Sequence, residues 1–98
     1  MTDYLPLPDI VTLLKVGDDF IISARDYITD NTLVGVAFYQ SESRMFRKGL
    51  IVTPLGGFLG HSENPNCMLI TKDKEWILWV IKDIQVHYPL TINKRLYL

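Results

Sequence analysis

The chain has 98 residues, of which 48% are hydrophobic and 21% are charged, so its composition excludes a disordered polypeptide and its length limits it to one domain, residues 1–98. The formal net charge of −1 gives no general attraction to nucleic acid, and neither a membrane-spanning apolar run nor a basic signal-peptide start is present. A single cysteine excludes an internal disulfide framework, so we expect a soluble, intracellular protein.

The first part of the chain predicts three short strands. Residues 10–16 are rich in β-branched side chains and indicate a strand, which residues 17–19 turn back into a second strand at residues 20–23. Residues 33–39 are mostly apolar and predict a third strand. Gly35 inside it indicates a β-bulge or the close approach of another part of the backbone.

The middle of the chain predicts a loop and one more short strand. Residues 41–49 are typical of a loop or a short irregular insert. Residues 50–53 predict a short strand that Pro54 ends. Helical periodicity is lacking throughout, so we expect a mainly β domain of short, twisted strands.

The clearest element is a hairpin near the end of the chain. Residues 68–71 and 75–81 flank a Lys-Asp-Lys turn and predict two antiparallel strands. Apolar side chains occupy both faces of the second strand. We therefore expect this strand to lie centrally in its sheet and to be covered on both sides, with Trp76 and Trp79 well buried.

A glycine-rich segment joins the strand at 50–53 to this hairpin. It contains three glycines, a histidine and an Asn-Pro-Asn turn, and residues 56–67 read G-G-F-L-G-H-S-E-N-P-N-C. Far fewer residues would suffice to connect two strands. The segment is therefore either a structural Ω-like loop or a functional loop.

Three stretches resemble the SET-domain family, the larger part of which transfers methyl groups from S-adenosylmethionine to protein lysines. Residues 58–67 resemble the family's F-I-N-H-S-x-x-P-N-C segment, and residues 22–27 are similar to its F-A-x-R-D-I segment. Residues 81–84 and 90–93 resemble the D-I and E-L-T segments of its C-terminal part. The resemblance covers nearly the whole chain and implies a single SET-like (β-clip) domain. Its C-terminal segment is expected to cross beside residues 60–67 in a knot-like arrangement.

The resemblance also implies a cofactor site. The family's Asn-His dipeptide, which holds S-adenosylmethionine largely through the histidine backbone, falls on Gly60 and His61. A glycine-rich turn near the N-terminus accepts the methionine end of the cofactor. The cofactor-binding residues implied in this chain are Gly17, Asp18, Phe20, Gly60, His61 and Asn66.

Three positions depart from the family pattern. Gly60 stands where the family has asparagine, and the family's G-x-G turn falls on residues 18–20, with Gly17 displaced by one residue. Lys94 occupies the place of the tyrosine that lines the channel where the methyl group moves. An ammonium beside a sulfonium is a like-charge pair, which costs about 4 kcal/mol at about 4 Å with an effective dielectric of about 20.

Two nearby tyrosines are candidates to replace the missing hydroxyl. Tyr97 is the candidate catalytic residue, yet in an extended strand it lies on the opposite face from Lys94. Tyr88 shares that face but lies about 20 Å from Lys94 in an extended chain. Either side chain needs a bend in the backbone to reach the channel.

Other chemistry finds less support in the same residues. The order of residues 61–67 is superficially similar to the H-x-E … P-C-x-x-C pattern of zinc deaminases, but Cys67 is the only cysteine, so we expect no metal site. A Cys67 nucleophile with His61 as base lacks an orienting group, and we expect a buried thiol. A basic patch from residues 44–48 and 94–95 is the remaining candidate for binding nucleic acid, and the net charge argues against it.

Three functions stay open. The resemblance implies a minimal protein-lysine N-methyltransferase with S-adenosylmethionine as cofactor and a lysine-bearing peptide or protein as partner. The alternatives are a catalytically degenerate SET-like domain that binds a peptide or partner, and a structural assembly module such as a homo-oligomer. Residues 1–43 carry a net charge of −5 and residues 44–98 a net charge of +4. An acidic half would attract a basic peptide, but such a run is more often a solvated face.

Overall fold

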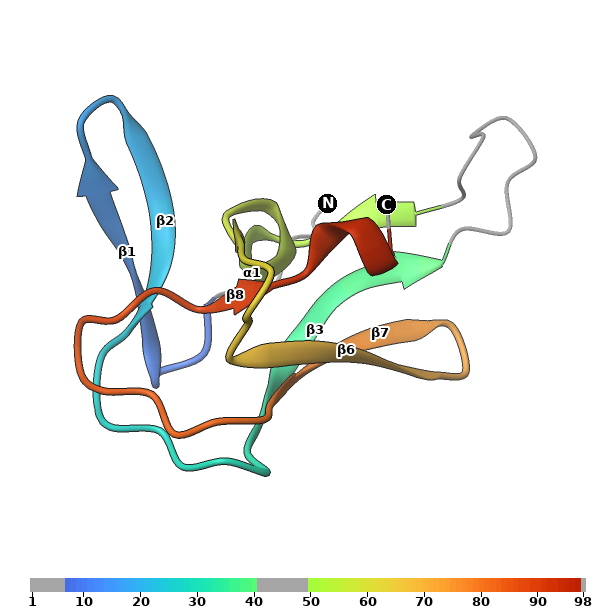
Figure 1. Cartoon of the computed structure of the whole chain (residues 1–98). Coiled ribbons are helices and arrows are strands. Elements are labelled where there is room, and N and C mark those ends of the chain that lie inside the picture. Colours follow the sequence, from blue (N-terminus) through green and yellow to red (C-terminus); the bar gives the residue numbers. More distant parts are fainter. Residues whose placement is uncertain (1–6, 41–49, 98) are drawn as a thin grey trace.

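The structure is a computed structural model that describes residues 7–40 and 50–97 (Figure 1). The loop predicted at residues 41–49 lies outside the described residues. The elements, in chain order, are β1 (Val11–Val16), β2 (Asp19–Ala24), β3 (Leu33–Gln40), β4 (Leu50–Val52), α1 (Pro54–Gly57), β5 (Gly60–His61), β6 (Cys67–Lys72), β7 (Glu75–Val80), β8 (Thr91–Ile92) and the 3₁₀ helix η1 (Lys94–Leu96). The domain is mainly β, as predicted. No helix in the described part of the chain is long and apolar enough to cross a membrane.

Strands β1 and β2 form a hairpin that projects from the rest of the domain (Figure 1). Its turn falls at the predicted position, where Gly17 has a φ of 64°, a left-handed conformation that favours glycine. Only the base of the hairpin contributes to the core, through Val11, Ile22 and Ala24, and residues 15–20 at its tip are exposed.

The largest sheet has four antiparallel strands in the order β4-β3-β7-β6. The predicted hairpin is present as β6 and β7, and Asp73 in its turn has a φ of 57°, which a short polar side chain tolerates. Strand β7 lies between β3 and β6, so its predicted central position is confirmed.

Gly35 shows both features that its place in a strand predicts. The pairing of β3 with β7 shifts register between Leu33 and Gly35, which marks a bulge. A Cβ atom on Gly35 would lie 3.2 Å from Cγ of Pro8 and 3.4 Å from Cδ2 of Leu55, so other residues approach its backbone closely.

Helix α1 packs its backbone directly against β3. Thr53 caps the helix: its Oγ1 accepts from the Gly56 N–H at 3.3 Å and lies 2.9 Å from the Ala37 carbonyl oxygen. A Cβ atom on Gly56 would lie 2.2 Å from that same oxygen. Glycine is therefore required at position 56 because nothing larger fits between helix and strand.

The four-stranded sheet has one buried face and one open face. Cross-strand partners share a face, and the buried face carries Cys67, Leu69, Leu78 and Val80, none more than 5% exposed. The opposite face is called the outer face below. Its apolar members include Leu33, Ile51, Met68, Ile70, Ile77 and Trp79.

No described element covers the outer face, where Leu33 is 54% and Ile51 53% exposed. The expectation that β7 is covered on both sides is therefore wrong for residues 7–40 and 50–97. Trp76 and Trp79 are half-buried rather than well buried. Trp76 packs against the core from the buried face, and Trp79 lies on the outer face. Apolar residues on both faces of a strand signalled its central position correctly but not a second covering layer.

The C-terminal segment lies beside the glycine-rich loop, as predicted. Strand β8 pairs in parallel with β5, placing Thr91 opposite Gly60 and Ile92 opposite His61. Leu90 and Ile92 are fully buried and anchor this segment in the core. The knot-like threading of the segment stays a prediction.

Candidate functional site

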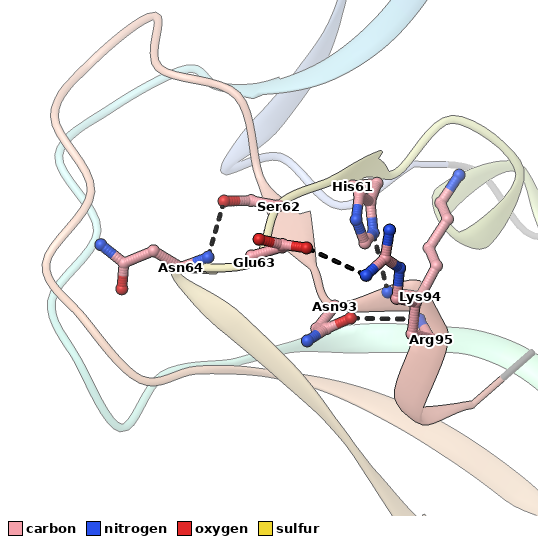
Figure 2. Close-up of polar contacts among 7 residues, drawn as sticks. All are labelled: His61, Ser62, Glu63, Asn64, Asn93, Lys94 and Arg95. Atoms are coloured by element: carbon pink, nitrogen blue, oxygen red, sulfur yellow. Dashed lines mark hydrogen bonds and ion pairs between the residues drawn. The ribbon is translucent and has the colours of Figure 1, made fainter.

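Three stretches expected to bind cofactor or line the channel converge around β5. The ring of Phe20 on β2 packs edge-to-face on the ring of Phe58, with centroids 6.3 Å apart. The Ile22 N–H donates to the Phe58 carbonyl oxygen at 3.0 Å, which ties the hairpin to the segment before β5. On the other side, the Lys94 N–H donates to Nδ1 of His61 at 3.1 Å (Figure 2). The hairpin, the glycine-rich loop and η1 thus meet at residues 58–61.

The backbone of His61 offers an open hydrogen-bonding edge. The Gly60 and Ser62 N–H groups donate to the Leu90 and Ile92 carbonyl oxygens, at 3.2 and 3.0 Å. Alternate residues of a strand direct these groups to opposite edges, so the N–H and C=O of His61 point away from β8. In the described part of the chain, no third strand joins β5 and β8. One donor and one acceptor therefore lie side by side on an exposed residue.

The side chain of His61 fixes the start of η1. Its Nδ1 accepts the Lys94 N–H, so the ring is in the tautomer that carries its proton on Nε2. The imidazole therefore positions η1, while the backbone of the same residue stays open.

Gly60, the first departure from the family pattern, lies where β5 approaches β8 closely. A Cβ atom there would be 3.3 Å from Cγ2 of Thr91 and 3.6 Å from the Leu90 carbonyl oxygen. An asparagine would therefore displace Thr91 by a few tenths of an ångström. Glycine permits this close pairing, and the family's side-chain contact to the cofactor is absent.

Asn66 joins the glycine-rich loop to the C-terminal segment. Its Nδ2 donates to the Pro89 carbonyl oxygen at 2.9 Å, and its Oδ1 accepts the Thr91 N–H at 2.9 Å. Its own N–H donates to Oγ1 of Thr91 at 3.2 Å. Both ends of the amide have protein partners, so Asn66 holds β8 beside β5. A direct contact between Asn66 and a cofactor stays a prediction.

Gly17 and Asp18 lie at the exposed tip of the hairpin, away from β5. Phe20, the third member of the predicted turn, is the one that reaches the central segment, through Phe58. A Cβ atom on Gly17 would meet no atom within 4 Å, so a side chain here would project into open space. The structure thus brings Phe20 close to the segment that contains Gly60 and His61. Gly17 and Asp18 lie at the periphery.

Lys94 and Tyr97 lie in a 3₁₀ turn rather than in a strand, so the expected alternation of faces does not apply. The Tyr97 N–H donates to the Lys94 carbonyl oxygen at 3.2 Å and closes the turn. The Tyr97 hydroxyl accepts the Leu69 N–H at 3.1 Å, and its ring packs edge-to-face on Trp76. This hydroxyl is therefore bound to the edge of β6, and the catalytic role of Tyr97 stays a prediction.

Two polar contacts that the sequence analysis missed surround this region. Arg95 and Glu63 form an ion pair at 3.0 Å (Figure 2), with side chains 77% and 71% exposed, which contributes at most about 1 kcal/mol. Lys82 donates to Oδ1 of Asn64. The partners are distant in sequence, and no local pattern signals such pairs.

A second cluster joins the two weaker motifs of the family resemblance. The Tyr27 hydroxyl donates to Oδ2 of Asp83 at 2.7 Å, and the Asp30 N–H donates to Oδ1 at 2.8 Å. These bonds lower the pKa of Asp83, and the Asp83 carboxylate raises the pKa of Tyr27. Ile28 and Ile84 form a β-bridge next to them. The cluster ties residues 25–32 to residues 81–88, away from β5.

Cys67 is buried, as predicted, and burial raises the pKa of its thiol to about 12. The thiol therefore stays protonated at neutral pH and is a poor nucleophile. Residues 7–40 and 50–97 contain no group of three or more His, Cys, Asp or Glu placed to hold a metal ion.

No family model and no curated protein matches this sequence. Among solved structures, the chain is similar to a Plasmodium falciparum "putative histone methyltransferase", with a TM-score of 0.71 over 85% of this chain and 90% of that chain. The fold is SET-like. Sequence identity across the match is 14%, so the likeness shows a shared fold and leaves the activity to be tested.

Proposed function

We propose that this chain is a minimal SET-like domain that binds S-adenosylmethionine beside β5 and transfers its methyl group to a protein lysine. Two findings support the proposal: the SET-like fold, and the convergence of Phe20, His61 and η1 on one segment. The observation that carries most weight is the open backbone edge of His61, because it supplies a specific contact for an adenosine group.

The residues present fit such a cofactor. Adenine displays an acceptor, N7, next to a donor, the N6 amino group. The N–H and C=O of one residue on an open strand edge offer the complementary pair, and His61 is such a residue. The rings of Phe20 and Phe58 lie at the neighbouring end of this segment and provide an aromatic surface for an apolar or cationic group.

The bound cofactor would supply an electrophilic methyl group on a sulfonium, for in-line transfer to a neutral amine. The protein then has to orient the two reactants and exclude water. The open backbone of His61 would hold the adenosine side, and the hairpin would contact the methionine side. The Tyr97 hydroxyl, the candidate to replace the tyrosine at the position of Lys94, would have to give up its hydrogen bond from the Leu69 N–H to reach the reactants.

A second candidate function, peptide or partner binding without methyl transfer, is favoured by the C-terminal segment. Lys94 places a cation where the family has a phenol, and the Tyr97 hydroxyl is engaged by Leu69. Both features would weaken binding of a sulfonium without disturbing the fold. This candidate predicts that the chain is stable and fails to transfer methyl groups.

The test is calorimetric titration with S-adenosylmethionine and with its neutral product, S-adenosylhomocysteine, on two variants of His61. His61→Pro removes the open N–H, while the ladder bonds donated by Gly60 and Ser62 remain. His61→Ala loses the same ring but keeps the N–H, so it is the matched control. We expect His61→Pro to bind at least about tenfold more weakly than His61→Ala, which corresponds to about 1.4 kcal/mol.

The outcomes separate the two candidates. Equal binding by the two variants would mean that the His61 N–H does not contact the ligand. No binding by the wild type to either ligand would favour the partner-binding function. Mass spectrometry of lysine peptides after incubation with S-adenosylmethionine then distinguishes a binding domain from an active enzyme.

A further inference from the structure

The outer face of the four-stranded sheet is an apolar surface that the proposed function does not use. Its partners in register are Met68 with Trp79 and Ile70 with Ile77. Met68 and Ile70 are each 38% exposed, and Leu33 opposite Trp79 is 54% exposed. Single exposed apolar residues are normal, but a contiguous set over four strands indicates an interaction surface.

The charges on the outer face indicate which kind of partner could bind there. Lys72 and Glu75 lie opposite each other in register at one end of the outer face, so their formal charges cancel. An anionic membrane or a nucleic acid requires a basic rim, which these two residues do not provide. Among the described residues of the outer face the charges therefore nearly cancel, and such a face does not repel a second copy of itself. The charge pattern therefore favours self-association over a strongly charged partner.

The edge strand β6 favours association by packing of the outer faces over association by strand pairing. Strand β6 is an edge strand, and an edge N–H is a ready site for pairing with another chain. The Leu69 N–H on this edge already donates to the Tyr97 hydroxyl. Pairing of β6 with another β6 would break that bond. Packing of one outer face on another leaves it intact.

We propose that the outer face binds the outer face of a second copy of this chain, in a weak, reversible dimer. Four strands about 4.8 Å apart, three to eight residues long and about six on average, give a face of roughly 20 by 20 Å. Two such faces bury roughly 800–1,000 Å² in total, which is below the usual range for stable dimers of about 1,200–2,000 Å². The area therefore predicts a transient dimer rather than an obligate one. This proposal is independent of methyl transfer.

The test is sedimentation velocity of the full chain from about 1 to about 500 µM. We expect the wild type to pass from monomer to dimer within this range, and Ile70→Glu to weaken association at least about tenfold because a charge replaces an apolar contact. Leu14→Glu is the matched control, since Leu14 is 40% exposed on the β1–β2 hairpin, away from the outer face. Circular dichroism checks that each variant is folded.

Fluorescence gives a second readout that does not depend on Ile70. Trp79 lies on the outer face and Trp76 on the buried face, so Trp76→Phe leaves a single reporter on the proposed interface. Its emission is expected to shift to shorter wavelength as dimer forms. A wild type that stays monomeric throughout, or a dimer that Leu14→Glu disrupts and Ile70→Glu does not, would overturn the proposal.

Discussion

The four-stranded sheet and the β5–β8 crossing are held together in different ways. The sheet depends on apolar burial, with Leu78 and Val80 fully buried on β7, between two neighbouring strands. The crossing is a two-residue parallel pairing, supported by the side chains of Asn66 and His61. Damage to the sheet should therefore unfold the domain. Damage to the crossing should first affect the candidate site.

The largest effect is expected where helix α1 meets the sheet. Gly56→Ala would place a Cβ atom 2.2 Å from the Ala37 carbonyl oxygen, so the backbone has to move. We expect a loss of about 3 kcal/mol or more in the free energy of unfolding, measured by urea denaturation. Gly57→Ala is the matched control, because its Cβ would make an ordinary contact of 3.4 Å with Val52. Equal losses in both variants would contradict the steric explanation.

The next largest effect is expected as a difference in stability loss between substitutions on the two faces of the sheet. Leu78→Ala removes a fully buried side chain and is expected to cost about 2–5 kcal/mol of stability. Met68→Ala, on the outer face, should cost less than about 1 kcal/mol in dilute monomer. Thermal unfolding at low concentration measures both. Comparable losses would mean that the outer face is covered.

A smaller effect is expected from the crossing. Asn66→Ala removes the bonds to Pro89 and Thr91, for an expected cost of about 1–3 kcal/mol. Asn66→Asp retains the acceptor for the Thr91 N–H and should fall between Asn66→Ala and the wild type. Ligand titration should show weaker S-adenosylhomocysteine binding by Asn66→Ala at temperatures where the variant is still folded. Undiminished binding would mean that the ligand site does not depend on the β5–β8 crossing.

The smallest effect concerns the exposed cluster around Asp83. Its pKa is lowered in the folded state, so its contribution to stability is present above the ordinary value of 3.8 and is lost as the pH falls through the lowered pKa. Tyr27→Phe removes the largest cause of that shift. The difference in melting temperature between Tyr27→Phe and the wild type should therefore shrink below pH 3.8. A difference that stays constant through this range would exclude Asp83 as its source.

The contrast between the sheet and the β5–β8 crossing also explains which features could be predicted from the sequence. The turn at Gly17 and the turn at Asp73 depend on residues next to one another, so their patterns were sufficient. Gly35 likewise predicted its bulge from its place in a strand. The antiparallel hairpins and the central place of β7 follow from such local signals.

Other features depend on contacts that no local pattern shows. Residues 94–96 form a 3₁₀ turn because Asn93 caps it and His61 accepts the Lys94 N–H, 33 residues away. Asn66 was predicted as a cofactor contact, and the structure shows its amide bound to Pro89 and Thr91. The half-burial of Trp79 depends on the absence of a covering layer among the described elements, which apolar alternation alone does not reveal.

The parallel pairing of β5 with β8 also sets an order of events during synthesis. Every partner of the Asn66 amide lies 23 to 25 residues downstream of it. The β1–β2 hairpin can form on the ribosome as soon as it leaves the exit tunnel, because its contacts are local. The crossing cannot close until residues 89–94 have also emerged. The nascent chain therefore exposes an open glycine-rich loop without a site, and a ligand that binds beside β5 would engage only chains whose C-terminal segment is already in place.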